Sequence, residues 1–102
     1  MTETRNRGTR KDGSSFSKAD VDEVWSKAKS IDGEDMNSVR TDVCGARIEY
    51  TRYGDTGHDS GWEIDHIVPV SKGGADAIDN LQPLQWENNR AKSDGDLNCV
   101  KT

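Results

Sequence analysis

Apolar residues near the start of the chain recur at a spacing that predicts a helix. Four of them fall at positions i, i+3, i+4 and i+7 and so share one helical face: Val21, Val24, Trp25 and Ala28. Ahead of them, Ser17 is followed three residues later by Asp20, an arrangement typical of a helix capping box. We expect about 13 helical residues, ending near Ile31 because Asp32-Gly33 is a turn signal. The simpler interpretation is a helix that covers the core, and a partner-binding helix is the alternative.

The second half of the chain predicts short strands and a closing helix. Residues 62–67 alternate as in a strand, so Asp65 and His66 should point to opposite faces unless the strand ends or bends there. Pro69, just beyond, is consistent with such a break. The other elements expected are a short strand over 46–50, a loop over 71–79, a strand over 81–84 and a helix from Trp86 to about Ser93. Together these elements indicate a small α+β fold with the covering helix in front.

Length and composition limit the domain organisation. A chain of 102 residues with 30 % apolar residues can form one domain with a small core. Residues 1–16 are rich in Thr, Arg, Gly and Ser, and we expect a flexible basic arm there, followed by a single domain over 17–102. No apolar run is long enough to span a membrane.

The net charge of −5 counts against a strong nonspecific hold on nucleic acid, which needs clustered lysines and arginines. The charge is unevenly distributed, because residues 1–18 hold five basic and two acidic side chains, whereas residues 19–65 hold five basic and twelve acidic ones. The basic arm could follow a phosphate backbone, although a solvated tail is the simpler interpretation. The acidic front half suits a protein partner.

The N-terminus indicates a cytoplasmic protein, and this location decides what is expected of the cysteines. No apolar stretch follows Met1, so the sequence shows no secretory signal. In the cytosol Cys44 and Cys99 should be reduced thiols, with a disulfide as the alternative. Two cysteines are too few for a four-cysteine zinc site, so oxygen and nitrogen ligands would dominate any metal site.

Several polar residues have the chemistry that phosphodiester hydrolysis requires. The reaction needs a base for the attacking water and positive charge for the phosphate and the leaving oxygen. His66 suits the base, because an imidazole accepts and releases protons near neutral pH. Asp65 suits a hard cation, and Asn89 offers a second oxygen ligand from the following helix. Asn80 could hold the loop, or His66, in position through hydrogen bonds.

The segment over 61–93 resembles the motif core of the HNH endonucleases, whose fold is a ββα-metal module. The residues that agree with the family pattern are Asp65, His66, Gly73, Gly74, Asn80, Leu81, Leu84, Asn89 and Lys92. The resemblance implies an endonuclease that hydrolyses DNA phosphodiester bonds with one divalent ion. The roles that it implies are metal binding by Asp65 and Asn89, activation of water by His66, positioning of that base by Asn80, and contact with the DNA backbone by Lys92, Arg90 and Lys72.

Two departures from the family pattern affect the expected metal content. Gln85 and Asn88 stand where many members have a second Cys-x-x-Cys pair, so we expect no structural zinc. Aromatic packing by Trp62 and Trp86 would have to substitute for it. Asn89 replaces the commoner histidine, and an all-oxygen set of ligands favours Mg²⁺, or else Mn²⁺, over Zn²⁺. Binding of the ion should be weak without DNA, because only one of the protein ligands is charged.

Other interpretations stay open at this point. Glu63 could face the site, whereas His58 is expected to be an exposed bystander. The chain could also keep the HNH fold as a catalytically weak nucleic-acid-binding protein, or as an accessory interaction protein of a phage or mobile element. A protein partner could supply specificity, since nothing in the chain indicates that it reads base sequence.

Overall fold

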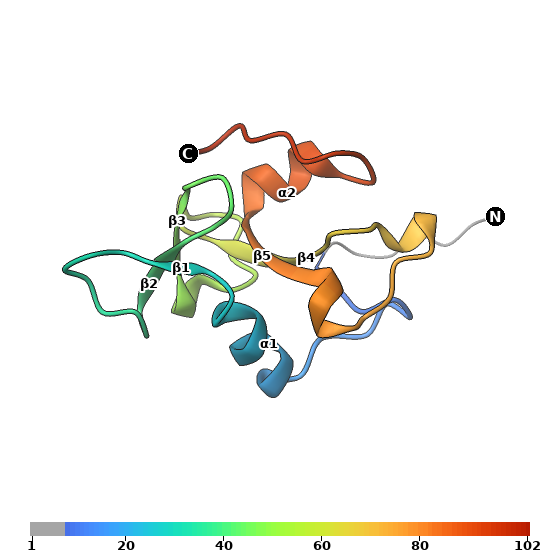
Figure 1. The fold of residues 1–102 in the computed structure, drawn as a ribbon, viewed down its shortest axis with the longest axis horizontal. Coiled ribbons are helices and arrows are strands. Elements are labelled where there is room, and N and C mark those ends of the chain that lie inside the picture. Colours follow the sequence, from blue (N-terminus) through green and yellow to red (C-terminus); the bar gives the residue numbers. More distant parts are fainter. Residues whose placement is uncertain (1–7) are drawn as a thin grey trace.

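The computed structural model describes residues 8–102, so the first seven residues of the arm expected over 1–16 lie outside the described part. The helices and strands follow one another as α1 (Lys18–Trp25), β1 (Lys29–Ser30), β2 (Val39–Thr41), β3 (Arg47–Glu49), β4 (Trp62–His66), β5 (Leu81–Gln85) and α2 (Trp86–Lys92). Short 3₁₀ turns lie at Tyr50–Arg52, Val70–Lys72 and Ile78–Asn80. Strands β1, β2 and β3 form one antiparallel sheet and β4 pairs with β5 in a second (Figure 1), which confirms the α+β class. Within residues 8–102, no helix has the length and apolar character needed to cross a membrane.

Helix α1 begins at the capping box that the sequence predicts. The Ser17 hydroxyl accepts a hydrogen bond from the backbone N–H of Asp20, and the Asp20 carboxylate accepts one from the backbone N–H of Ser17. The helix has 8 residues and is shorter than expected, because the chain tightens after Val24 into i→i+3 hydrogen bonds before it enters β1. All four of the expected apolar residues are nevertheless buried. Their face lies against the core and is not open to a partner.

Strands β4 and β5 pair along their whole length, from Trp62 opposite Gln85 to His66 opposite Leu81. A long loop connects them, and helix α2 follows β5 without an intervening turn. The order of strand, long loop, strand and helix is the one that the sequence predicts. Figure 1 shows α2 on one side of this strand pair and α1 on the other.

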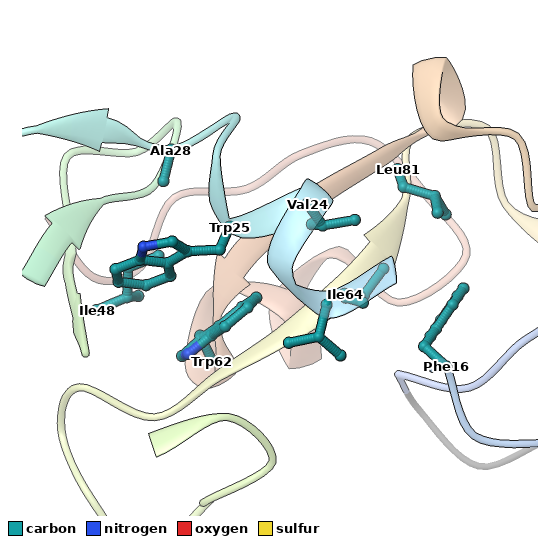
Figure 2. Packing of buried hydrophobic residues seen from close by; sticks show 9 residues of the cluster. Phe16, Val24, Trp25, Ala28, Ile48, Trp62, Ile64 and Leu81 are labelled. Carbon is teal, nitrogen blue, oxygen red and sulfur yellow. The ribbon is translucent and has the colours of Figure 1, made fainter. Parts of the chain in front are cut away.

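The core lies between α1 and the two sheets, and Trp62 is at its centre. The ring of Trp62 is fully buried, and its centroid lies 5.3 Å from that of Trp25 and 4.9 Å from that of Tyr53. Figure 2 shows the two tryptophan rings with aliphatic side chains of α1, β3, β4 and β5 around them. Trp62 and Ile64 anchor β4 in this core through alternate positions of the strand. The alternate side chains, Glu63 and Asp65, are therefore directed toward α2.

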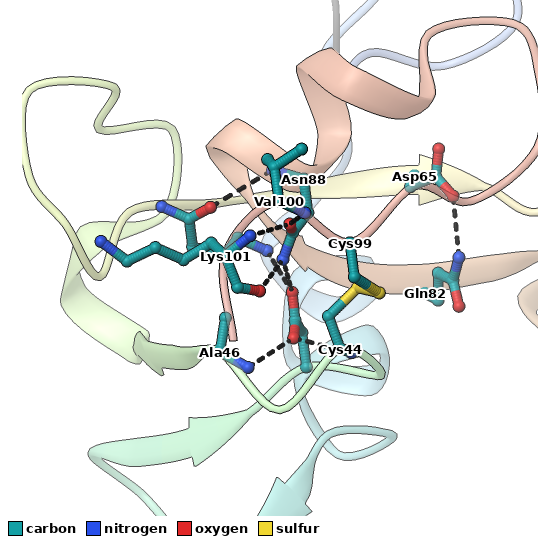
Figure 3. Close-up of a disulfide and its surroundings, with 10 residues drawn as sticks. Cys44, Ala46, Asp65, Gln82, Asn88, Cys99, Val100 and Lys101 are labelled. Carbon is teal, nitrogen blue, oxygen red and sulfur yellow. Dashed lines mark hydrogen bonds between the residues drawn. A yellow bond between two sulfur atoms is a disulfide. The ribbon is translucent and has the colours of Figure 1, made fainter.

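The C-terminal tail returns to the turn between β2 and β3, where Cys99 and Cys44 form a disulfide (Figure 3). The expectation of reduced thiols is therefore wrong. The two cysteines are 55 residues apart in sequence, and they meet because Asn88 of α2 binds the backbone of the tail at Val100 and Lys101. Disulfides are uncommon in cytosolic proteins, so the bond counts against the expected cytoplasmic location.

Loss of the disulfide should lower the free energy of unfolding by about 4 kcal/mol, because the bond closes a long loop in the unfolded chain. Urea unfolding of the wild type and of the Cys44→Ser/Cys99→Ser variant measures the difference. The variant should keep the native circular dichroism spectrum, since the hydrogen bonds from Asn88 to the tail do not need the sulfur atoms. A difference below about 1 kcal/mol would show that the tail is not tied down by this bond.

Candidate active site

The polar face of β4 lies against α2, and the contacts between the two elements form two pairs. Asn89 donates from Nδ2 to Oε1 of Glu63 at 2.9 Å. Further along the helix, Nζ of Lys92 lies 3.4 Å from Oδ1 of Asp65 and donates to the backbone carbonyl of His66 at 3.0 Å. The two acids are two residues apart on a strand and their partners are three apart on a helix, so all four side chains meet between the elements.

Asp65 is 5 % exposed, and both of its carboxylate oxygens have partners. Besides the contact of Oδ1 with Lys92, Oδ2 accepts a hydrogen bond from Nε2 of Gln82, its register partner on β5, at 2.9 Å. Burial raises the pKa of Asp65, although the hydrogen bond from Gln82 and the charge of Lys92 act in the opposite direction. This carboxylate is therefore shielded from solvent, and Lys92 supplies the nearby positive charge.

His66 ends β4 and has its partners on the other side of the strand. The residue is 4 % exposed, and its ring lies beside that of Phe16, with 6.0 Å between the centroids. Nε2 lies 2.8 Å from Oδ1 of Asp76, a residue of the loop between β4 and β5. The neighbours Asp65 and His66 thus have different surroundings, α2 and this loop, as alternation along a strand predicts.

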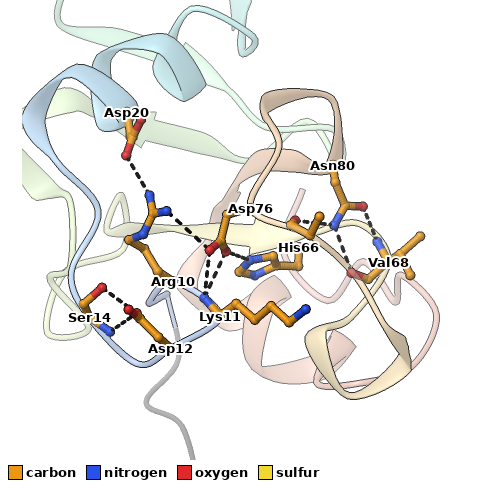
Figure 4. Close-up of polar contacts among 10 residues, drawn as sticks. Arg10, Lys11, Asp12, Ser14, Asp20, His66, Val68, Asp76 and Asn80 are labelled. Carbon is orange, nitrogen blue, oxygen red and sulfur yellow. Dashed lines mark hydrogen bonds and ion pairs between the residues drawn. The ribbon is translucent and has the colours of Figure 1, made fainter.

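Asp76 is held in turn by the segment that precedes α1 (Figure 4). The backbone N–H of Lys11 donates to both carboxylate oxygens, at 2.9 and 3.2 Å, and the guanidinium of Arg10 lies 3.6 Å from Oδ2. Burial raises the pKa of Asp76, but the hydrogen bonds from His66 and Lys11, with the nearby positive charges, outweigh it and keep the pKa below its ordinary value. The described part of the arm therefore packs against the candidate base.

The lowered pKa makes the stabilisation by Asp76 depend on pH. Folding favours the ionised carboxylate, so its contribution is complete above the ordinary value of 3.8 and is lost as the pH falls through the lower pKa of the folded protein. The difference in free energy of unfolding between the wild type and Asp76→Asn should be larger at neutral pH than below pH 3.8. Urea unfolding across this range measures it, with Asp79→Asn, an exposed acid of the same loop, as the control. A difference that does not change with pH would contradict the expectation.

Asn80 closes the loop between β4 and β5 by binding backbone groups. Its Oδ1 accepts from the N–H of Val68 at 2.8 Å, and its Nδ2 donates to the carbonyls of Val68 and Ala75 at 3.1 and 2.9 Å. Gly74 lies against the same loop, and a Cβ there would come within 1.7 Å of the Val68 carbonyl oxygen, so only glycine fits. Among residues 8–102, the hydrogen bonds of the Asn80 side chain do not include His66. Asn80 shapes the chain that follows the histidine.

The three expected DNA contacts differ in exposure. Lys72 is exposed on the loop, and Arg90 is exposed on α2 with its guanidinium 3.9 Å from Oε2 of Glu63. Lys92 is buried, and its ammonium binds groups of β4. A phosphate can therefore reach Lys72 and Arg90 from solvent, whereas it would meet Lys92 only within the site itself.

A buried carboxylate joins the turn between β2 and β3 to the start of α2. Oδ1 of Asp42 accepts from the backbone N–H groups of Cys44 and Ala46, both at 2.9 Å. Oδ2 accepts from the backbone N–H of Gln85 at 2.9 Å and from Nδ2 of Asn88 at 3.0 Å. The Gln85 side chain also caps the first turn of α2. Hydrogen bonds and the disulfide thus hold together the region for which the sequence suggests aromatic packing.

The β4–α2 face offers few oxygen atoms to a hard divalent ion, and both oxygens of Asp65 already have partners, Lys92 and Gln82. Asp65 has a carboxylate there, and Asn89 can offer its amide oxygen because its amide nitrogen is bound to Glu63. Proteins commonly hold Mg²⁺ through one or two carboxylates and leave the other positions to water and phosphate. Within residues 8–102, no cluster of three or more His, Cys, Asp and Glu side chains could hold a metal. A site of this kind therefore depends on the amide and on the substrate as well as on the carboxylate.

The sequence does not reveal every residue of the site. Asp76 carries no recognisable signal, since it acts through partners that only the folded chain brings close. Asp42 belongs to a lead-in segment that resembles the family, but its bonds to Gln85 and Asn88 depend on the fold. Glu63 could be found from strand alternation, which places it on the face of Asp65. His58 is half-buried instead of exposed, and its Nδ1 accepts from the backbone N–H of Ser60 at 3.0 Å.

A two-stranded antiparallel pair followed directly by a helix, with an Asp-His pair at the end of the first strand, defines a ββα module. The family described as HNH endonuclease matches residues 42–95, which is more than half of the chain. The chain belongs to the HNH endonuclease family. Comparison with curated proteins and with solved structures gave no match.

Proposed function

We propose that the protein is a metal-dependent endonuclease that hydrolyses phosphodiester bonds of DNA. The observation that best supports this proposal is the buried carboxylate of Asp65 near the end of β4, which lies against Lys92 of α2 and is followed directly by His66. A cation-binding carboxylate and an imidazole base are two groups that this hydrolysis uses. Membership of the HNH endonuclease family supports the same class of reaction.

In this proposal the β4–α2 face binds one divalent ion. Asp65 and Asn89 are its protein ligands. Glu63 binds the amide nitrogen of Asn89, which leaves the amide oxygen free to bind the ion. Mg²⁺, with Mn²⁺ as a substitute, supplies Lewis acidity that balances charge on the phosphate and on the leaving oxygen. His66 accepts the proton of the attacking water. Asn80 supports it indirectly, by closing the loop that begins just after β4.

The exposed cations around this face suggest how DNA approaches. Lys72 and Arg90 are open to solvent and can contact phosphates of the backbone. Lys92 balances the charge of Asp65 inside the protein, and a phosphate bound to an ion at this carboxylate would meet the same ammonium. Contacts to the DNA backbone carry no information on base sequence, so we propose that a protein partner supplies specificity.

Cleavage of supercoiled plasmid DNA tests the proposed reaction. Nicked and linear products should form with Mg²⁺ or Mn²⁺ and should be absent with EDTA. Asp65→Asn keeps the shape of the side chain but removes its charge, and it should slow cleavage by about 100-fold, since even groups behind a metal ligand contribute about 10- to 100-fold. Asp94→Asn, at an exposed position after α2, is the control. Failure of the wild type to cut any DNA form with either ion would overturn the proposal.

The burial of His66 favours a second candidate function. Because the imidazole is buried between Asp76 and Phe16, the chain could bind nucleic acid through the HNH fold while catalysing little. Fluorescence anisotropy of labelled DNA, measured alongside the plasmid assay, separates the two. Binding with no cleavage supports the second function. Cleavage that depends on Asp65 supports the first.

We also propose that the fold needs no structural zinc. Asp42 accepts hydrogen bonds from four donors and joins the β2–β3 turn to the start of α2, where Gln85 and Asn88 stand in place of the second cysteine pair of other members. Treatment with EDTA should therefore leave the midpoint of urea unfolding unchanged. Elemental analysis of the purified protein provides the check, because a stoichiometric zinc content with a loss of stability on chelation would contradict this view.

A further inference from the structure

Asp76 is the hydrogen-bond partner of the His66 ring. It lies in the loop between β4 and β5, and its Oδ1 is 2.8 Å from Nε2 of His66. An ionised carboxylate only accepts hydrogen bonds, so Nε2 must carry the proton that joins the two groups. In a neutral imidazole the other nitrogen, Nδ1, then holds the lone pair.

The carboxylate of Asp76 is fixed from the opposite side by the start of the described chain. The backbone N–H of Lys11 donates to both oxygens, and Arg10 lies between Asp76 and Asp20 of α1, at 3.6 and 3.3 Å (Figure 4). Phe16 packs beside the imidazole on the same side of β4. A ring that is bonded at one nitrogen to an immobilised carboxylate and packed beside an aromatic ring has little freedom to rotate.

We propose that Asp76 is a positioning residue for His66, which fixes the orientation of the ring and keeps the proton on Nε2, so that Nδ1 is the atom that accepts a proton from water. This inference rests on the proposed role of His66 as the base. Residues 10–16 then contribute to the site as well, because they hold Asp76 against the histidine.

The tautomer of His66 provides a readout that does not depend on activity. Two-bond correlations between the ring nitrogens and the carbon-bound protons of ¹⁵N-labelled, metal-free protein should show the Nε2-protonated form at a pH where the ring is neutral. Asp76→Ala should convert this signal to a mixture of tautomers, whereas Asp76→Asn should preserve it, because an amide oxygen also accepts the bond. His58 is an internal reference for folding, since its Nδ1 accepts from the N–H of Ser60 without the help of Asp76.

Cleavage kinetics supply the second readout. Asp76→Ala should lower kcat by about 10- to 100-fold with little change in KM, and Asp76→Asn should recover part of the loss. Asp79→Ala, in the same loop, should behave as the wild type. An unchanged tautomer in Asp76→Ala would overturn the inference. Faster cleavage by that variant would overturn it too, since Asp76 would then be covering the base. If no form of the protein cleaves DNA, the proposed function fails, while the tautomer still decides whether Asp76 positions His66.

Discussion

Replacement of His66 by alanine should slow DNA cleavage by about 10²- to 10⁴-fold, the range that a general base contributes. The imidazole follows the proposed metal ligand Asp65 directly in the chain, and the neighbouring acid Glu63 is already bound to Asn89. His66 has its partners on the opposite side of β4 from Glu63, so this acid is not placed to act as the base instead. The measurement is the initial rate of plasmid nicking at saturating Mg²⁺.

The matched control is the other histidine of the chain, which lies in the loop before β4. His58→Ala should leave the cleavage rate within about 2-fold of the wild type, because the side chain of this half-buried residue binds the backbone of Ser60 instead of a group of the site. Circular dichroism must show that His66→Ala is folded, because the ring of His66 is buried beside Phe16. A folded His66→Ala variant that cleaves as fast as the wild type would remove the base from the mechanism.

Replacement of Asp42 by alanine should lower the free energy of unfolding by about 4 kcal/mol. The substitution leaves four donors without their acceptor, and a buried unsatisfied group costs about 1–3 kcal/mol when water cannot replace the partner. Small domains have only about 5–15 kcal/mol of stability in total, so the variant should be near the limit of folding at physiological temperature. Urea unfolding followed by tryptophan fluorescence measures the loss.

Two further variants show whether the carboxylate itself is responsible. Asp42→Asn should recover only part of the loss, because its amide nitrogen would face the donors of Gln85 or of the β2–β3 turn. Asp32→Ala, at an exposed turn position, should change the stability by no more than about 0.5 kcal/mol. Equal unfolding midpoints for Asp42→Ala and Asp32→Ala would show that this network does not hold the turn to α2.

The elements of the ββα module could be predicted because their signals are local. Alternation over 62–67 and the apolar residues of 81–84 each describe a strand without reference to the rest of the chain. Strands β1 and β2 have 2 and 3 residues, which is too short for alternation to be recognised. The apolar spacing does not predict the early end of α1, since Ala28 continues this spacing but lies in a tight turn.

The candidate site was also only partly predictable from the sequence. The motif order identifies Asp65, His66 and Asn89, but the groups that touch them come from elsewhere in the fold. Gln82 reaches Asp65 through the strand register, and Asp76 reaches His66 through the course of a long loop. Tertiary structure determines these contacts, and it also determines the pairing of Cys44 with Cys99. The spacing of residues along the sequence therefore does not predict them.

The location of the bound ion can be mapped by adding small amounts of Mn²⁺ to ¹⁵N-labelled protein, because this paramagnetic ion broadens the NMR signals of nearby nuclei. We predict that the backbone signals of residues 64–66 and 88–90 disappear first, and that Asp65→Asn removes the effect at both places. Signals from the acidic turn over 32–35 should persist. Broadening that starts at this turn, or that is unchanged in Asp65→Asn, would contradict the assignment of Asp65 and Asn89 as ligands of one divalent ion.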